Sequence, residues 1–153
     1  MLTGFKLSLD DGAISVDGIA QKLTAGLSRQ AAVAALGSFF TGNVEHKNAI
    51  EWVYLQGLSF EGAASGMSLC FERGGLVEVN WSVSLDEAEL DGGWPTQEAI
   101  DQEIAFVRAA LARMSPRGSF SGRERFGWGE VWSEFDEQAF NASSGLRYKA
   151  TPA

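Results

Sequence analysis

The segment GMSLCFERGGLVEVNWSVSL (residues 66–85) consists of two runs with a period of two, joined by a pair of glycines. Its alternating apolar residues are Met67, Leu69 and Phe71 in the first run and Val77, Val79, Trp81, Val83 and Leu85 in the second. Successive side chains of a strand point to opposite faces of a sheet. The segment therefore predicts an antiparallel hairpin with one buried face and one polar face that meets water or a partner.

Further strands are predicted on both sides of this hairpin. Residues 4–17 form a hairpin, and in IEWVYLQG (50–57) Trp52 and Tyr54 share one face while Val53 and Leu55 share the other. GEVWSEFDEQ (129–138) and SGLRYKA (144–150) form a closing hairpin, with turn residues in NASSG (141–145). FFTGNVEHKN (39–48) and residues 115–127 are predicted to be loops.

Two helices complete the prediction. Apolar residues recur at spacings of four and three from Ile100 through Ile104, Val107 and Leu111 to Met114, which gives one apolar stripe on a long helix at about 96–114. A short alanine-rich helix at about 28–36 begins at a serine cap and ends at a glycine. The expected fold class is α+β, with an antiparallel sheet packed against both helices.

The composition indicates a single domain spanning residues 1–153, with 45% hydrophobic residues and a net charge of −8. No apolar run approaches the roughly 20 residues that a membrane span needs, and the N-terminus lacks the pattern of a secretory signal. The single cysteine, Cys70, excludes an internal disulfide, and we expect it to be a buried, inert thiol. The expected location is the cytoplasm.

Acidic residues are concentrated between Arg73 and Arg108, an interval without lysine or arginine. The acids are Glu78, Asp86, Glu87, Glu89, Asp91, Glu98, Asp101 and Glu103. Such a surface repels nucleic acid and attracts a basic partner, although a solvated face that serves solubility has the same composition.

The residues that catalysis and metal binding require are scarce. With one histidine, His46, and one cysteine, a zinc site is not expected. The sequence contains no GxSxG elbow and no glycine-rich phosphate loop, and GWG (127–129) precedes a strand instead of a helix. We therefore expect neither enzymatic activity nor a cofactor.

The stretch FGWGEVWSEFDEQAF (126–140) combines aromatic and acidic residues. If residues 128–136 are extended, Trp128, Glu130, Trp132, Glu134 and Asp136 share one face. Three unpaired carboxylates cannot be buried, so this face is predicted to be at least partly open, as a protein interface would be. The equally weighted alternative is that both tryptophans lie under the 117–125 loop and that its arginines pair locally. A bulge near Gly129 would change the facing.

The whole pattern, from a hairpin and small helix to a closing aromatic hairpin, resembles small bacterial immunity proteins of contact-dependent, type VI and polymorphic toxin systems. The motif that carries the resemblance consists of Phe126, Trp128, Gly129, Val131, Phe135 and Asp136. The resemblance implies a non-enzymatic protein that binds and neutralises a cognate toxin.

Residues 23–80 also resemble the SmpA/OmlA envelope lipoproteins and β-lactamase-inhibitor-like domains. The similar features are Gly26-Leu27-Ser28 at a helix start, Leu36-Gly37 at its end, Trp52-Val53-Tyr54 in a strand, and a glycine turn at 74–75. That resemblance implies an envelope assembly adaptor, but the lipoprotein cysteine at the N-terminus is missing.

These patterns together predict a partner-binding surface for a basic protein toxin, without nucleic acid, membrane, metal or cofactor. Its predicted residues are Trp128, Glu130, Trp132, Glu134, Asp136, Asp86, Glu87, Glu89 and Asp91. A second hypothesis is a small-ligand or enzyme pocket on the open sheet face, lined by Trp52, Tyr54, Trp81 and Trp132.

Overall fold

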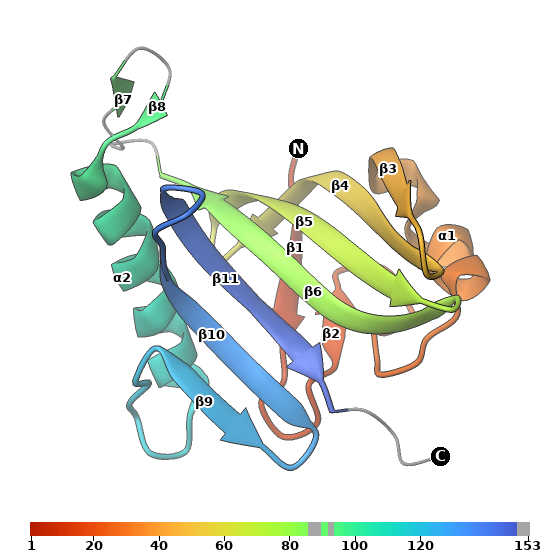
Figure 1. The fold of residues 1–153 in the computed structure, drawn as a ribbon. Helices are drawn as coiled ribbons and strands as arrows, with labels where there is room; N and C mark the ends of the chain where they lie inside the picture. The colour runs from red at the N-terminus through yellow and green to blue at the C-terminus, as the bar shows by residue number, and fades with distance from the viewer. Residues whose placement is uncertain (86–89, 92–93, 150–153) are drawn as a thin grey trace.

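The computed structural model describes residues 1–85, 90–91 and 94–149 and contains one curled sheet of nine strands with two helices (Figure 1). The strand order is β2-β1-β4-β5-β6-β11-β10-β9, and β3 also pairs with β4. The strands of this sheet are β1 (Thr3–Leu7), β2 (Ile14–Val16), β3 (Phe40–His46), β4 (Ile50–Phe60), β5 (Ala63–Glu72), β6 (Gly75–Ser84), β9 (Arg123–Phe126), β10 (Gly129–Asp136) and β11 (Asn141–Tyr148). A two-residue ribbon, β7 (Leu90–Asp91) and β8 (Trp94–Pro95), precedes the second helix. The α+β class is confirmed.

The hairpin predicted for residues 66–85 is β5 and β6, joined through left-handed conformations at Arg73 and Gly74. Its alternation is interrupted once. Cys70 pairs with Glu78 and Phe71 pairs with Leu76, so Val77 is the extra residue of a bulge. Leu76 is fully buried in its place, and the prediction that Val77 belongs to the buried series is wrong.

Both helices begin where the sequence predicts. The hydroxyl of Thr96 accepts a hydrogen bond from the backbone N–H of Ala99, and α2 runs from Gln97–Met114. Ser28 caps α1 (Arg29–Leu36) in the same way, and a short 3₁₀ turn, η1 (Gly37–Phe39), follows it. The predicted apolar stripe of α2 is buried from Ile100 to Leu111 and partly buried at Met114, and the helix packs mainly against β10 and β11. None of the described helices is long and apolar enough to cross a membrane.

Three segments differ from the prediction. Residues 40–46 and 123–126, expected in loops, are the strands β3 and β9, and the closing turn lies at 137–140 instead of 141–145. β3 is exposed along almost its whole length, so no burial periodicity marks it in the sequence. Phe140 closes the turn in a left-handed conformation, which glycine and asparagine adopt more often than phenylalanine. The residues NASSG after it are therefore part of β11 and pair with β10.

The sheet is mixed because β1 runs parallel to β4. The first half of β4, residues 50–55, pairs with β3, and its last residues, Leu58–Phe60, pair with β1. Gly57, with φ +87°, lies at the break between the two halves. One long strand therefore joins the N-terminal hairpin to the central sheet.

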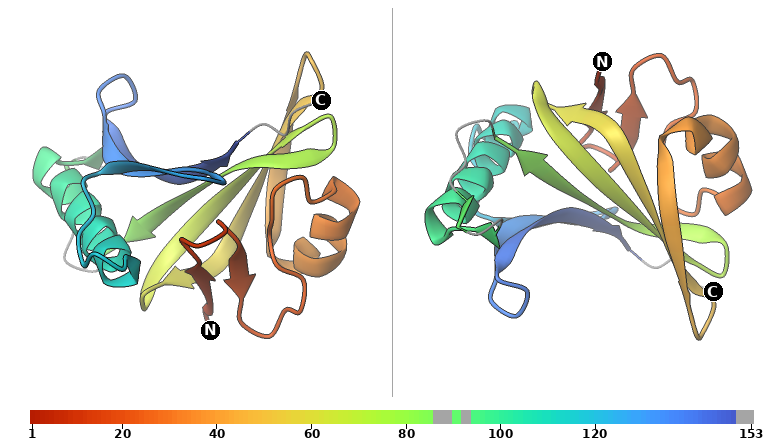
Figure 2. Two further views of the ribbon diagram at one scale, coloured as in Figure 1. Left: turned by 90° about the horizontal axis from the view of Figure 1, so that it is seen from below. Right: turned by 90° about the horizontal axis from the view of Figure 1, so that it is seen from above.

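The core fills one side of the sheet. It includes Phe5, Phe60 and Trp81, whose rings contact one another, and Val107 and Leu111 from α2. Figure 2 shows the β1–β2 hairpin on this side, while the β10–β11 and β3–β4 loops project to the other side. Neither of the described helices α1 and α2 lies over that second side in Figure 1.

Candidate functional site

We use the name open face for the uncovered side of the sheet, which consists of the outward side chains of β3, β4, β5, β6, β11, β10 and β9. One cross-strand row along it follows the strand register from Tyr54 through Ser68, Asn80, Gly145 and Trp132 to Arg123. Because each member of the row comes from a different strand, most of them far apart in the sequence, the sheet register assembles this surface.

Trp132 lies flat on the open face and is almost fully covered, with 6% of its surface exposed. The absence of a side chain at Gly145 makes room for it, since a Cβ there would lie 2.9 Å from the indole Cζ2. The indole N–H donates to the hydroxyl of Ser143 at 3.1 Å. The guanidinium carbon of Arg123 lies 4.9 Å from the ring centroid.

Arg123 also forms ion pairs with two of the predicted interface acids. Its guanidinium donates to Glu130 at 2.9 Å and to Glu134 at 2.5 Å. The hydrogen bond that Arg123 donates to Glu134 is the largest of the causes that raise the pKa of Arg123. The geometry of Trp132, Glu130 and Glu134 therefore corresponds to the local-pairing alternative, and these two carboxylates are not free charges.

Trp128 is separated from this cluster, so the predicted common face is wrong for this residue. It lies in the turn before β10, its indole N–H donates to the carbonyl of Leu9 at 2.8 Å, and its ring stacks on Phe126. The strand begins at Gly129, where a Cβ would lie only 2.1 Å from the carbonyl oxygen of Arg147. Period-two facing does not extend through a turn, so Trp128 packs against the core instead.

Asp136 differs from the other predicted acids of β10. Its Oδ1 accepts hydrogen bonds from the backbone N–H groups of Gln138 and Ala139, at 3.1 and 3.3 Å, which shape the turn. Among the described residues, no lysine, arginine or histidine forms an ion pair with it. Its carboxylate therefore differs from those of Glu130 and Glu134, which share the guanidinium of Arg123.

The acidic segment is only partly described. Asp86, Glu87 and Glu89 lie outside the described residues, and Asp91 pairs with Trp94 in the β7–β8 ribbon. Farther along α2, Glu98 and Asp101 are exposed, whereas Glu103 turns inward and accepts a hydrogen bond from the backbone N–H of Val83 at 3.1 Å. Glu103 thereby satisfies the donor of Val83, a residue of β6 beyond its pairing with β11.

The sequence prediction of the interface missed an apolar patch at the opposite end of the open face. Val44 stands opposite Trp52 in the β3–β4 pair and is 43% exposed, and Tyr54 is 37% exposed. Both are among the large apolar side chains that remain in solvent. The alternation of IEWVYLQG identified Tyr54, but nothing marked Val44 because its segment was predicted to be a loop.

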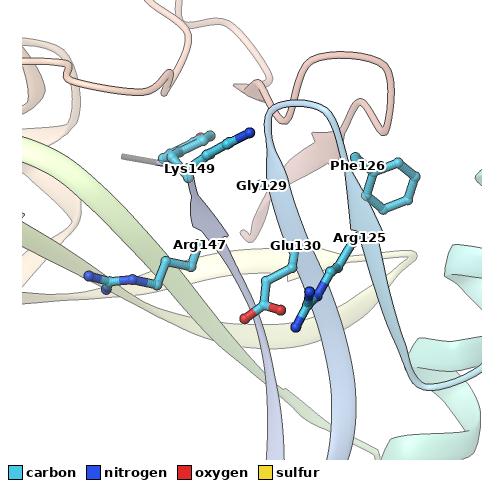
Figure 3. A pocket seen from close by; sticks show the side chains of 7 residues that line it. Arg125, Phe126, Gly129, Glu130, Arg147 and Lys149 are labelled. Atoms are coloured by element: carbon cyan, nitrogen blue, oxygen red, sulfur yellow. The ribbon is translucent and has the colours of Figure 1, made fainter. Parts of the chain in front are cut away.

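A shallow pocket of about 400 Å³ opens at the ends of β9, β10 and β11 (Figure 3). Arg125, Arg147 and Lys149 surround it together with Phe126 and Glu130. Glu130 is held by Arg123, and the guanidinium of Arg147 points away toward Glu78, with which it pairs at 3.1 Å. Among the described residues that line the pocket there is no serine, cysteine or histidine.

The structure also bears on metal binding, on the cysteine and on the predicted aromatic pocket. The described residues contain no group of three or more histidine, cysteine, aspartate or glutamate side chains that could hold a metal ion. Cys70 is buried, as predicted, and desolvation raises the pKa of its thiol to about 11. The ring of Trp81 packs in the core against Phe60, so Trp52, Tyr54, Trp81 and Trp132 do not form one aromatic pocket.

Comparison with solved structures shows a likeness in fold. No protein-family model matches the sequence, and no curated protein matches it. A chain in the solved structure described as "Rhs1-CT in complex with cognate immunity protein RhsI1" is similar in fold, with a TM-score of 0.48 and 10% sequence identity. The similarity covers 97% of this chain and 88% of that one. At this level it is a partial likeness in the course of the chain and assigns no family.

Proposed function

We propose that this chain is a non-enzymatic bacterial immunity protein that acts in the cytoplasm by binding and blocking a cognate toxin through the open face. The observation that carries the proposal is the composition of that face. Exposed apolar side chains, Val44 and Tyr54, lie at one end of the face, and ion pairs lie toward its other end, with none of the described helices above them. Aromatic anchors within a polar surround are typical of protein interfaces.

Charge supports a basic toxin as the partner. The chain carries a net charge of −8, and the acidic segment that includes Asp86, Glu87, Glu89 and Asp91 adds a concentrated negative region. Opposite charge accelerates association and selects among partners, and the acceleration decreases as the salt concentration rises. In this proposal Val44 and Tyr54 contribute most of the affinity, and the acidic segment increases the rate of association.

The experiment begins with capture by tagged protein from the native bacterium at low salt, followed by purification of the captured domain. The wild type is then compared with a Val44→Ser, Tyr54→Ala double variant, both for affinity and for protection of growth when the two genes are co-expressed. Leu2→Ser is the matched control, because Leu2 is 48% exposed and the N-terminus lies on the opposite side of the sheet (Figure 2).

The proposal predicts that the captured domain arrests growth, that one equivalent of the chain relieves the arrest, and that only the double variant fails. Protection by far less than one equivalent would contradict the proposal, because turnover would indicate an enzyme. A captured domain without toxicity, or equal protection by the double variant, would also contradict it.

A further inference from the structure

A polar groove crosses the open face between the apolar patch on β4 and the tip of the β10–β11 hairpin. Its volume is about 300 Å³, and the side chains that define it include Tyr54, Gln56, Asn80, Ser82, Asp136 and Asn141. Gly66 contributes no side chain to it, and a Cβ there would lie 3.1 Å from the amide nitrogen of Gln56. The groove is therefore formed by a missing side chain in the middle of the sheet and by polar groups around it.

The groove carries a negative charge and no positive one among its described residues. Among the described residues that line it, Asp136 is the single carboxylate, and none is a lysine, arginine or histidine. Each of the other carboxylates described on β5, β6 and β10 contacts a guanidinium, since Arg123 pairs with Glu130 and Glu134 and Arg147 pairs with Glu72 and Glu78. Because Asp136 uses only Oδ1 in its turn, Oδ2 is left for an external donor.

The neutral groups of the groove match a planar cation. Amide and hydroxyl oxygens of Gln56, Ser82 and Asn141 can accept the N–H groups that a guanidinium presents in one plane. The exposed ring of Tyr54 offers a surface on which such a plane stacks. A neutral polar ligand could use the amides and hydroxyls, but it would leave the carboxylate without a partner.

We infer that this groove receives an arginine side chain of the protein partner, with its guanidinium between Tyr54 and the carboxylate of Asp136. The inference rests on the proposed function for the identity of the partner, but the groove itself can be tested without one. The probe is N-acetyl-arginine amide, and N-acetyl-citrulline amide, which has nearly the same shape without the charge, is its control. Binding is followed by NMR on isotope-labelled full-length protein.

The arginine probe is expected to shift the side-chain amides of Gln56, Asn80 and Asn141 in a saturable way, with little effect from citrulline. Asp136→Asn retains an oxygen for the turn but removes the charge, so the Kd should rise about twofold to fivefold. Glu137→Gln removes an exposed charge one residue away and should leave the Kd unchanged. Equal binding of citrulline, or equal affinity in Asp136→Asn, would overturn the inference.

The two proposals can fail separately. If arginine does not bind in the groove but the Val44→Ser, Tyr54→Ala variant loses the toxin, the open face remains the interface and only the groove assignment is wrong. If arginine binds as described but no toxin is captured or neutralised, the groove is a guanidinium site on a protein with another function. A purified partner adds a third comparison, in which Asp136→Asn should weaken the complex and Glu137→Gln should not.

Discussion

The guanidinium of Arg123 lies 4.9 Å from the ring centroid of Trp132 and joins the two carboxylates on either side of it in β10. The arrangement connects an edge strand to its neighbour through one aromatic ring and two ion pairs. In the structure Trp132 is almost fully covered, and the two carboxylates share one positive charge, so the cluster stays acidic but both acids are held in place. The contribution of Arg123 can therefore be separated into a stability effect and a charge effect.

Replacing Arg123 by alanine should lower the free energy of unfolding by about 1 kcal/mol, because a cation–π contact and two partly exposed ion pairs are lost. Urea denaturation measures the change. Arg125→Ala is the matched control, since Arg125 forms no ion pair with a described residue. Equal destabilisation by both variants would show that the stacking on Trp132 contributes nothing specific.

Trp128 should matter for folding and not for partner binding. Trp128→Phe removes the hydrogen bond to the carbonyl of Leu9 and should cost about 1 kcal/mol, whereas Trp128→Ala should cost about 3 kcal/mol. Thermal unfolding measures both. Trp52→Phe is the control on the open face and should cost less than Trp128→Phe, because the ring of Trp52 forms no hydrogen bond with a described residue. A larger cost at Trp52 would contradict this assignment.

Glu103 should make stability depend on pH. Burial raises the pKa of its carboxyl from the ordinary value of 4.5, and this effect outweighs the hydrogen bond from Val83, which lowers it. The folded state therefore holds the proton more tightly than the unfolded chain, so this contribution is full below pH 4.5 and is lost as the pH rises. Glu103→Gln keeps an acceptor for Val83 and cannot ionise.

This variant should accordingly be more stable than wild type at pH 7.5, by an amount that shrinks as the pH is lowered toward 5. Urea midpoints at several pH values measure the difference. Glu103→Ala should be less stable than Glu103→Gln at every pH, since it leaves the N–H of Val83 without an acceptor. A gain for Glu103→Gln that grows toward low pH would contradict the sign of the pKa shift.

Cys70 should react slowly with thiol reagents in the folded protein. Its pKa of about 11, against an ordinary 9.0, lowers the thiolate fraction at pH 8 by about 100-fold, and burial slows access further. Absorbance with a disulfide reagent measures the rate, in buffer and in urea. A Cys70→Ser, Ser68→Cys double variant places the thiol in the groove of the open face and should react much faster.

The sequence predicts correctly those elements whose apolar residues repeat at a regular spacing along the chain. The 66–85 hairpin, the stripe of α2 and the two faces of β4 follow from alternation or from helical spacing, because burial of one face imposes a period on consecutive residues. β3 could not be predicted, since a strand exposed on both faces has no such period.

The candidate site was less accessible to prediction. The sequence identified Glu130, Trp132, Glu134 and Asp136 as one face of an extended strand, and β10 places them so. The sequence prediction grouped Trp128 with them because it extended the strand alternation through residues 127–128. These residues form a turn, which no pattern in the sequence indicates. It also left open whether Arg123 pairs with the acids, which depends on the register between β9 and β10.

The sequence alone determined the class of fold, the strongly periodic elements and the excess of negative charge, since these depend on composition and on neighbouring residues. Tertiary structure decided which charges remain free and which aromatic rings are exposed. Cross-strand register sets those contacts, bringing Arg123 over Trp132 and Val44 beside Trp52 while leaving Asp136 unpaired among the described residues. Register depends on the pairing of whole strands, and no single segment of the chain specifies it.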